Sequence, residues 1–353
     1  MKILALVHPG LELLAQQEIW ELLNLPSHLA PSTVEAEISA PDFPFLLQHG
    51  QSFQRLLLPI ARLSQLQPIS LEALPWSKLI TPTIKYMVDI EHITGVEVRQ
   101  GLVRQLSQEL IAQVQKTLHL TPRLDMKNPD IVLLVHFTGK EYIVGLDLIG
   151  KELHKRAYRV FPHQASFTGD IAYYLLRFSG YAPGEKLLVG MSKDGALAIE
   201  AALFANRLPL QHSSLLSKYP LFSPLPSPST PLLKHRLDAF DEAVPNITAA
   251  RKNSYLAGTK EAIAFQKYAL DELDIKYNEQ EFDRLIFHLT TKDEEKINEL
   301  YYQSAFLLKK KGTLLIITRK NLPLFESEHF TLIKKAELQR GESTHMLWLF
   351  QRK

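Results

Sequence analysis

The chain has 353 residues, 46% of them hydrophobic and 22% charged, which is enough apolar material for two or three folded units. Its formal net charge of +2 excludes a uniformly basic surface, so any contact with nucleic acid must come from a local patch. The sequence has no cysteine, which excludes disulfides and zinc knuckles and favours a reducing compartment, the cytoplasm. Because no run of about 18 uncharged apolar residues occurs, we expect no membrane span.

The first predicted unit covers residues 1–65. A short β-branched and apolar run at 2–7 indicates a strand, and residues 11–23 have the apolar spacing of an amphipathic helix. We expect a second helical stretch at about 43–63. This alternation predicts a small α+β domain.

The second predicted unit covers residues 66–160 and begins with a proline-containing connector at 68–82. Residues 85–90 indicate a strand, and residues 101–118 carry apolar side chains at helical spacing. Two further apolar runs, 131–137 and 142–146, are separated by a short turn that contains Gly139. Together these two runs predict a β-hairpin.

The third predicted unit, residues 161–353, alternates strand and helix signals. We expect strands at 186–190, 236–241, 262–267, 284–289 and 312–318. Such alternation predicts an α/β fold with a parallel, doubly wound sheet. The last residues indicate two strands joined by a turn at Gly341, which would form an antiparallel edge. The proline- and serine-rich segment 220–233 has no periodicity and is predicted to be a surface loop.

Two segments resemble a known family. HPGLELLAQQEI resembles the entry helix of the N-terminal ferredoxin-like domain in THUMP proteins, and GLDLIGKELHKRAYR is similar to the end of the THUMP domain in RNA guanine-N2 methyltransferases. The resemblance extends over nearly the whole chain. It implies a ferredoxin-like domain at 1–65, a THUMP domain at 66–160 and a Rossmann-like class I methyltransferase fold at 161–353.

The junction between the second and third units is rich in cations and carries an aromatic ring, a combination that can neutralise phosphates and stack on an exposed base. The candidate RNA-binding residues are Lys151, His154, Lys155, Arg156, Tyr158 and Arg159. The alternative is a charged turn that packs two domains together. The resemblance favours RNA contact and implies structured RNA, with tRNA as the first candidate.

The resemblance also implies S-adenosylmethionine as cofactor. Its site needs a glycine-rich turn after the first strand, because a backbone without Cβ lets the cofactor approach closely. Here the turn reads VGMSKDG, with Lys193 in the place of a family glycine and with Met191 and Gly195 in register. Asp241 falls on the acidic position that binds ribose, although an aspartate at a strand end is also a common helix cap. We therefore regard these cofactor positions as vestigial and cofactor binding as doubtful.

The family's adenine-binding aspartate is also replaced. Its position aligns with Ala269, unless Asp271 substitutes for it two residues later. No close pair of histidines has metal-ligand spacing, so no metal is expected.

The catalytic motif of amine-methylating relatives is Asn/Asp-Pro-Pro-Tyr/Phe, in which an oxygen accepts hydrogen bonds from the amine and the ring stacks on the flipped base. The matching positions in this chain are His288, Leu289, Thr290 and Thr291. A neutral His288 could accept one hydrogen bond, but Thr291 cannot stack. No catalytic motif is therefore intact.

Three hypotheses follow. The first is an RNA-binding THUMP protein with a degenerate methyltransferase domain, which binds structured RNA and could support a partner enzyme. The second is an active S-adenosylmethionine-dependent RNA methyltransferase with altered motifs. The third is a protein-interaction scaffold without an RNA role.

Overall fold

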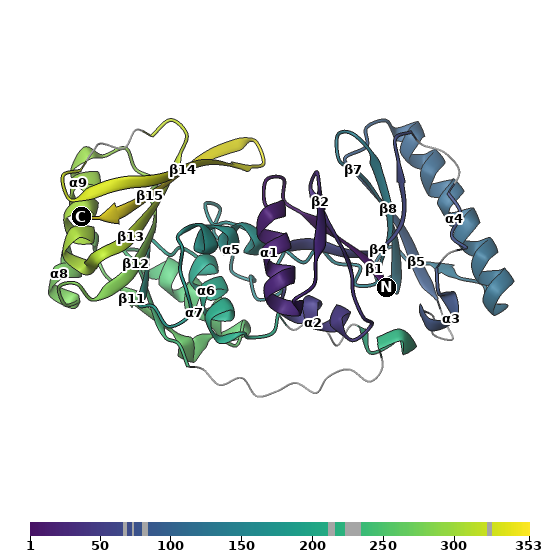
Figure 1. Cartoon of the computed structure of the whole chain (residues 1–353), viewed down its shortest axis with the longest axis horizontal. Coiled ribbons are helices and arrows are strands. Elements are labelled where there is room, and N and C mark those ends of the chain that lie inside the picture. Colours follow the sequence, from purple (N-terminus) through teal and green to yellow (C-terminus); the bar gives the residue numbers. More distant parts are fainter. Residues whose placement is uncertain (66–68, 73, 80–83, 211–215, 223–233, 323–326) are drawn as a thin grey trace. The chain divides into compact units, whose positions relative to one another are not determined.

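The structure is a computed structural model that describes residues 1–353 except 66–68, 73, 80–83, 211–215, 223–233 and 323–326. The chain divides into two compact units. Unit 1 comprises residues 1–154 and 209–229, and unit 2 comprises residues 155–208 and 230–353. Each unit contains its own β-sheet (Figure 1).

Unit 1 is built on one mixed sheet with the strand order β2-β3-β1-β4-β8-β7-β5-β6. The strands are β1 (Lys2–Val7), β2 (Ser27–Ala30), β3 (Thr33–Glu37), β4 (Phe53–Leu63), β5 (Lys85–Glu91), β6 (Arg123–Leu124), β7 (Ile131–Phe137) and β8 (Tyr142–Asp147), and the helices are α1 (Glu12–Leu23), α2 (Asp42–His49), α3 (Trp76–Leu79) and α4 (Val96–Leu118). Strand β4 pairs with β1 on one side and with β8 on the other. The sheet therefore runs continuously through the ranges 1–65 and 66–160, whose separation into two domains stays a prediction.

The predicted strand at 2–7, the first helix and the hairpin of β7 and β8 are confirmed. The helix predicted at 43–63 is wrong beyond residue 49, because residues 53–63 form β4. Leu56 and Leu57 are both fully buried, and a central strand buried on both faces has a continuous apolar run that periodicity cannot separate from a buried helix. Gly50 marks the break, since a Cβ there would lie 2.1 Å from the ring of Phe53.

One loop prediction also needs correction. Residues 220–222 form a short 3₁₀ helix, and Phe222 is buried in unit 1, where its ring stacks on Phe43 with 5.1 Å between centroids. This start of the predicted surface loop therefore belongs to the core, and residues 223–233 lie outside the described residues. Within the predicted connector, Trp76 is buried and its indole nitrogen donates to the carbonyl of Leu71.

Unit 2 contains a seven-stranded sheet with the order β11-β10-β9-β12-β13-β15-β14. Its elements are α5 (Gly169–Phe178), β9 (Leu187–Gly190), α6 (Ala196–Asn206), β10 (Leu237–Asp241), α7 (Val244–Leu256), β11 (Ile263–Lys267), α8 (Leu273–Lys276), β12 (Phe282–His288), α9 (Glu294–Leu307), β13 (Leu308–Arg319), β14 (Phe330–Arg340) and β15 (Ser343–Arg352). The five strands β11, β10, β9, β12 and β13 are parallel to one another. Strand β15 is antiparallel to both β13 and β14. The predicted doubly wound sheet with an antiparallel edge is confirmed.

Apolar side chains from strands and helices form the hydrophobic core against the sheet of unit 2. Phe240 and Phe287 from neighbouring parts of the sheet are fully buried and their rings meet edge to face at 5.9 Å. A Cβ on Gly190 would lie 2.2 Å from the Phe287 ring, so this close packing requires glycine at the end of β9. Among the helices of the described residues, none combines the length and apolar character needed to cross a membrane.

Candidate functional site

The candidate site lies at the carboxyl ends of β9 and β12. The chain winds from β9 toward β10 and β11 on one side and toward β12 and β13 on the other, so the strand order reverses between β9 and β12. In open α/β sheets, ligands bind in the crevice outside the strand ends at such a reversal. The turn after β9 and His288 at the end of β12 come together here, together with Asp241 at the end of β10.

The turn after β9 has an unusual backbone. Met191, Lys193 and Gly195 have positive φ angles of 55°, 53° and 81°. Glycine adopts this region freely, whereas a residue with a Cβ adopts it at a cost of roughly 1–2 kcal/mol. At Gly195 the glycine is also needed for packing, since a Cβ would lie 2.9 Å from that of Ala250 on α7. Gly195 is thus a structural position that keeps α6 close to α7.

The side chain of Lys193 points into the crevice instead of toward solvent. The residue is only 7% exposed, and its Nζ lies 2.5 Å from Nδ1 of His288. Burial lowers the pKa of Lys193 to about 7, against the opposing charge of Asp241. Burial, reinforced by the charge of Lys193, lowers the pKa of His288 well below its usual value. The arrangement therefore favours a neutral His288 whose Nδ1 accepts a hydrogen bond from Lys193.

Aromatic rings close the same crevice. The ring of Phe167 lies 4.6 Å from that of His288, and His345 on β15 lies 5.8 Å from His288. Burial, followed by the charge of Arg340, lowers the pKa of His345 to about 4. Sequence reasoning missed Phe167 and His345, because both approach His288 only through the tertiary fold.

Very little free space remains between these side chains. The cavity bounded by the turn after β9, Phe167 and His288 measures about 20 Å³. That volume holds roughly one water molecule, whereas small-molecule sites typically measure about 300–1,000 Å³. The residues present at the switch point therefore do not fit the methionine portion of S-adenosylmethionine.

Asp241 is buried and already has several hydrogen-bond donors. Its Oδ2 accepts from the backbone nitrogen of Lys193 at 2.9 Å, and its Oδ1 accepts from Ala243 and from the side chain of Asn246. The carboxylate thus joins the end of β10 to the turn after β9 and to Ala243 and Asn246 around the start of α7. Its role as a ribose ligand stays a prediction.

Two larger cavities flank the closed crevice. One, of about 480 Å³, lies at the ends of β10 and β11 and is lined mainly by acidic residues, and Ala269 and Asp271 both border it. The other, of about 460 Å³, lies beyond β12 and is lined by Leu289, Thr290, Lys292, Arg319, Lys320, Asn321, Leu322, Glu342, Ser343 and Thr344. Both cavities open at the carboxyl edge of the sheet.

Two residues of the tetrapeptide that replaces the catalytic motif, Leu289 and Thr290, line this second cavity directly after the end of β12. Leu289 is fully buried and its backbone nitrogen donates to the carbonyl of Ile317. Thr290 is exposed, and Thr291 accepts a hydrogen bond from the backbone of Asp293 before α9. Leu289, Thr290 and Thr291 supply no aromatic surface for stacking.

The predicted RNA-binding segment 151–159 is only partly on the surface. Arg156 is 4% exposed, and its guanidinium donates twice to Glu200, at 2.8 and 3.1 Å. The hydroxyl of Tyr158, also buried, donates to the same carboxylate. Arg159 pairs with the buried Asp194 at 2.8 Å.

Contact of these three residues with RNA stays a prediction, and in unit 2 they have a structural role. The physical reason is that the buried carboxylates of Glu200 and Asp194 require cationic partners. Lys151 and Lys155 are exposed and His154 is partly buried, so RNA contact by these residues stays a prediction.

A separate polar cluster in unit 1 was also missed. Glu91, His92 and His136 place one potential ligand atom each within 4.8 Å of one another. Arg55 donates to Glu91 at 2.8 Å and to Asp147 at 2.9 Å, so the cluster is centred on a buried ion-pair network. Strands β4, β5 and β7 bring these residues together from distant parts of the sequence.

The parallel sheet, the switch point and the antiparallel edge define a Rossmann-like methyltransferase-type domain. A model of the RMKL-like methyltransferase domain matches residues 156–345, which is more than half of the chain. The chain belongs to this family.

Curated relatives support the same grouping. The chain is 26% identical over 232 residues to a tRNA (guanine(6)-N2)-methyltransferase of Archaeoglobus fulgidus, covering 63% of this chain and 55% of that protein. It is 29% identical over 135 residues to the ribosomal RNA large subunit methyltransferase K/L of Photobacterium profundum, covering 38% and 19% of the two chains. The chain is related to these RNA methyltransferases, and it spans about half of their length or less.

Solved structures share the fold over the whole chain. TrmN from Thermus thermophilus matches with a TM-score of 0.71 and 20% identity, covering 100% of this chain and 99% of that one. A putative methyltransferase solved in complex with SAH matches with a TM-score of 0.73 and 17% identity, covering 100% and 98%. At these identities the similarity establishes the fold alone.

Proposed function

We propose that this chain is an RNA-binding member of the family whose methyltransferase-type domain does not use S-adenosylmethionine. The observation that carries the proposal is the contact of Lys193 with His288, which leaves a cavity of only about 20 Å³ at the switch point. A ligand could enter this place only if the Lys193 side chain left it. The fold is preserved around the crevice, while the space for the methionine portion is filled.

The residues at the end of β12 support the same proposal. Methylation of an exocyclic amine requires an acceptor that orients the nitrogen and a ring that stacks on the base. The Nδ1 of His288 is already engaged by Lys193, and Leu289 is part of the apolar core. These positions therefore lack both requirements.

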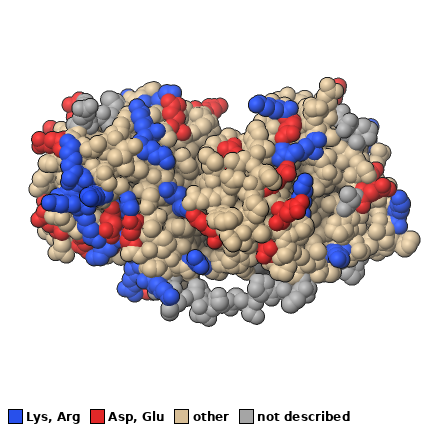
Figure 2. Space-filling model, in the orientation of Figure 1, with Lys and Arg blue, Asp and Glu red and all other residues tan. Residues whose placement is uncertain are grey.

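The RNA-binding half of the proposal rests on the family and on charge. Relatives are named as tRNA and ribosomal RNA methyltransferases, and structured RNA, tRNA above all, is the ligand that we propose. A THUMP-type role for unit 1 belongs to this proposal. Lys and Arg gather in separate groups among Asp and Glu on the face shown in Figure 2, so RNA binding must use local patches.

An active methyltransferase is the second candidate. The relatives' names favour it, as do Asp241 at the end of β10 and the 480 Å³ cavity beside Asp271. This candidate requires Lys193 to leave the crevice when the cofactor arrives. It therefore predicts measurable cofactor binding by the unmodified protein.

Calorimetric titration with S-adenosylmethionine separates the two candidates. We expect no binding by the natural protein and measurable binding by the Lys193→Gly variant, because glycine suits the positive φ and empties the crevice. Lys311→Gly is the matched control, since Lys311 is exposed and also has a positive φ of 63°. Micromolar binding by the natural protein would overturn the proposal.

RNA binding is tested independently by the fluorescence anisotropy of a labelled, unmodified tRNA transcript. We expect saturable binding that weakens as salt rises, because phosphate contacts release counterions. If the natural protein binds no RNA at low salt, the RNA-binding proposal fails and the scaffold hypothesis replaces it.

A further inference from the structure

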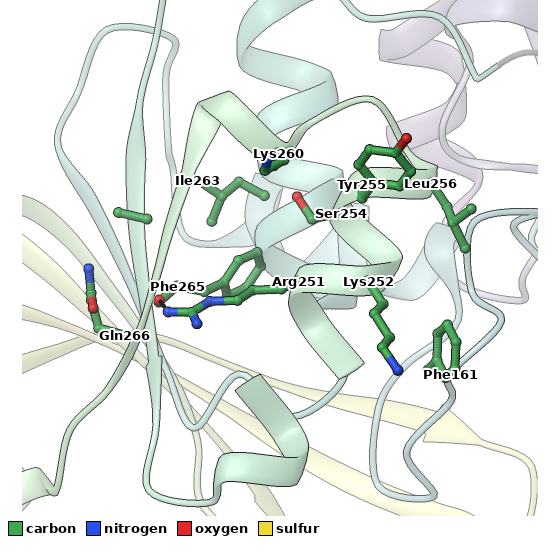
Figure 3. Close-up of a pocket in the computed structure, with 11 residues that line it drawn as sticks. Phe161, Arg251, Lys252, Ser254, Tyr255, Leu256, Lys260, Ile263, Phe265 and Gln266 are labelled. Carbon is green, nitrogen blue, oxygen red and sulfur yellow. Dashed lines mark hydrogen bonds between the residues drawn. The ribbon is translucent and has the colours of Figure 1, made fainter. Parts of the chain in front are cut away.

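A groove lies at the open edge of the sheet in unit 2, between β11 and α7. It measures about 560 Å³ and is lined by Phe161, Arg251, Lys252, Ser254, Tyr255, Leu256, Lys260, Ile263, Ala264, Phe265 and Gln266 (Figure 3). None of these residues lines the cavities at the switch point and its two flanks. The groove is therefore a separate site from the closed crevice.

Exposed aromatic and apolar surface borders the groove. Tyr255 is 71% exposed, Phe161 is 39% exposed and Leu256 is 42% exposed. Two aromatic rings that lie open to solvent beside one groove are a platform on which a planar ligand can stack.

The charge of the groove has one sign. Arg251, Lys252 and Lys260 line it, and the lining includes no Asp or Glu. The Nζ of Lys252 lies 4.7 Å from the centre of the Phe161 ring, so a cation and an exposed ring are already adjacent (Figure 3). Lys260 pairs with Glu261 at 3.8 Å, and both side chains are about two-thirds exposed. The groove thus favours an anionic ligand.

Strand β11 is the terminal strand of the sheet, which raises the alternative of a peptide that pairs with its edge. Arg251 opposes that alternative, because its guanidinium donates to the carbonyl of Phe265 at 2.5 Å. A peptide strand would have to displace this contact to continue the hydrogen-bond ladder. A stacked, negatively charged ligand leaves it intact.

We propose that this groove binds an unpaired nucleotide of RNA, with the base stacked on Tyr255 and the backbone phosphate near Lys252 and Lys260. Exposed rings interleaved with cations are the features by which proteins bind single-stranded nucleic acid without sequence preference. The inference rests on the proposed RNA-binding function and adds a second point of RNA contact in unit 2, away from the switch point.

The test is the binding of fluorescein-labelled single-stranded hexauridylate to the full chain, followed by anisotropy. We expect Tyr255→Ala to weaken binding about fivefold or more, because loss of one stacked base costs that much or more. Tyr255→Phe should bind like the natural protein, since it keeps the ring. Tyr302→Ala is the matched control, because Tyr302 on α9 is also exposed, at 56%, and lies outside the groove.

The charge contribution is tested by Lys252→Gln. This change should weaken binding and reduce the slope of log affinity against log salt by roughly 0.7, the value for one lost contact with a single strand. Lys310→Gln, which removes an exposed lysine outside the groove, should leave both quantities unchanged.

The outcomes distinguish the two proposals. If the natural protein binds the labelled tRNA transcript but Tyr255→Ala and Lys252→Gln bind hexauridylate like the controls, the groove proposal is overturned and the RNA-binding function stands. If the natural protein binds neither RNA, the proposed RNA-binding function fails, and the groove proposal that rests on it fails as well. Photocrosslinking of 4-thiouridine-substituted RNA to a peptide containing Tyr255 is the positive result expected from direct contact.

Discussion

The Nζ of Lys193 lies 2.5 Å from Nδ1 of His288, and this contact connects the turn after β9 to the end of β12. It spans the place where the strand order of the parallel sheet reverses. The buried side chain of Lys193 thus occupies the crevice at this switch point. The cost of burying this amine gives the contact a measurable consequence.

Lys193→Met should change how stability depends on pH. Between about pH 7 and 10.5 the unfolded chain binds the proton that the folded protein has lost, so the free energy of unfolding of the natural protein rises with pH. Below about pH 7 the amine is charged in the folded protein as well, so the folded state carries the full free-energy cost of burying that charge. We expect the variant to be more stable at pH 6, on the order of 3 kcal/mol, and to lack the rise between pH 7 and 9.

Urea unfolding at pH 6, 7, 8 and 9 measures this effect. Lys311→Met is the control, since Lys311 is exposed and its loss should leave the pH dependence unchanged. An unchanged rise in the Lys193→Met variant would show that the buried amine is not its source.

Arg156→Met should destabilise unit 2 by about 3–5 kcal/mol, because it leaves the fully buried carboxylate of Glu200 without its cation. The double variant Arg156→Met with Glu200→Met should recover much of that loss, since no uncompensated charge remains. Chemical denaturation of the three proteins measures the difference. A loss below about 1 kcal/mol in the single variant would contradict the buried ion pair.

Glu91→Gln should alter acid stability in unit 1. Although burial opposes it, the hydrogen bond from His136 and the charge of Arg55 lower the pKa of Glu91 to about 2. The ionised carboxylate therefore stabilises the fold above pH 4.5, and this contribution is lost as the pH falls toward 2. We expect the variant to be less stable at pH 7, by about 3 kcal/mol, and to lose less on acidification.

Thermal unfolding at pH 7, 5 and 3.5 checks this expectation. Glu72→Gln is the control, because Glu72 belongs to an exposed pair with Lys116. Equal acid sensitivity of the natural protein and Glu91→Gln would count against the network around Arg55.

Phe222→Ala should destabilise unit 1 by about 3–5 kcal/mol, since it removes a buried ring that stacks on Phe43. Phe45→Ala, on the same helix as Phe43 but 37% exposed, should cost much less. The midpoint of urea unfolding compares the two. Equal losses would argue against the burial of residues 220–222 in the core.

Much of unit 2 was predictable from the sequence. Alternating strand and helix signals in 161–353 fixed the parallel sheet, because each strand there is a short apolar run bounded by helical segments. Strand β4 was not predictable, since its apolar run is buried on both faces and has no alternation. Phe222 was not predictable either, because it lies in a proline-rich segment without periodicity and yet packs into the core.

The sequence by itself determined that Lys193 stands where a family glycine is expected and that His288 begins the altered motif, because both are local substitutions between matching flanks. Only the tertiary structure decided where their side chains point. It also directed Arg156 and Tyr158 inward to Glu200 and brought His345 next to His288. The physical reason is that these partners lie 42 to 95 residues apart or on different strands, so sheet register and burial, not local pattern, bring them into contact.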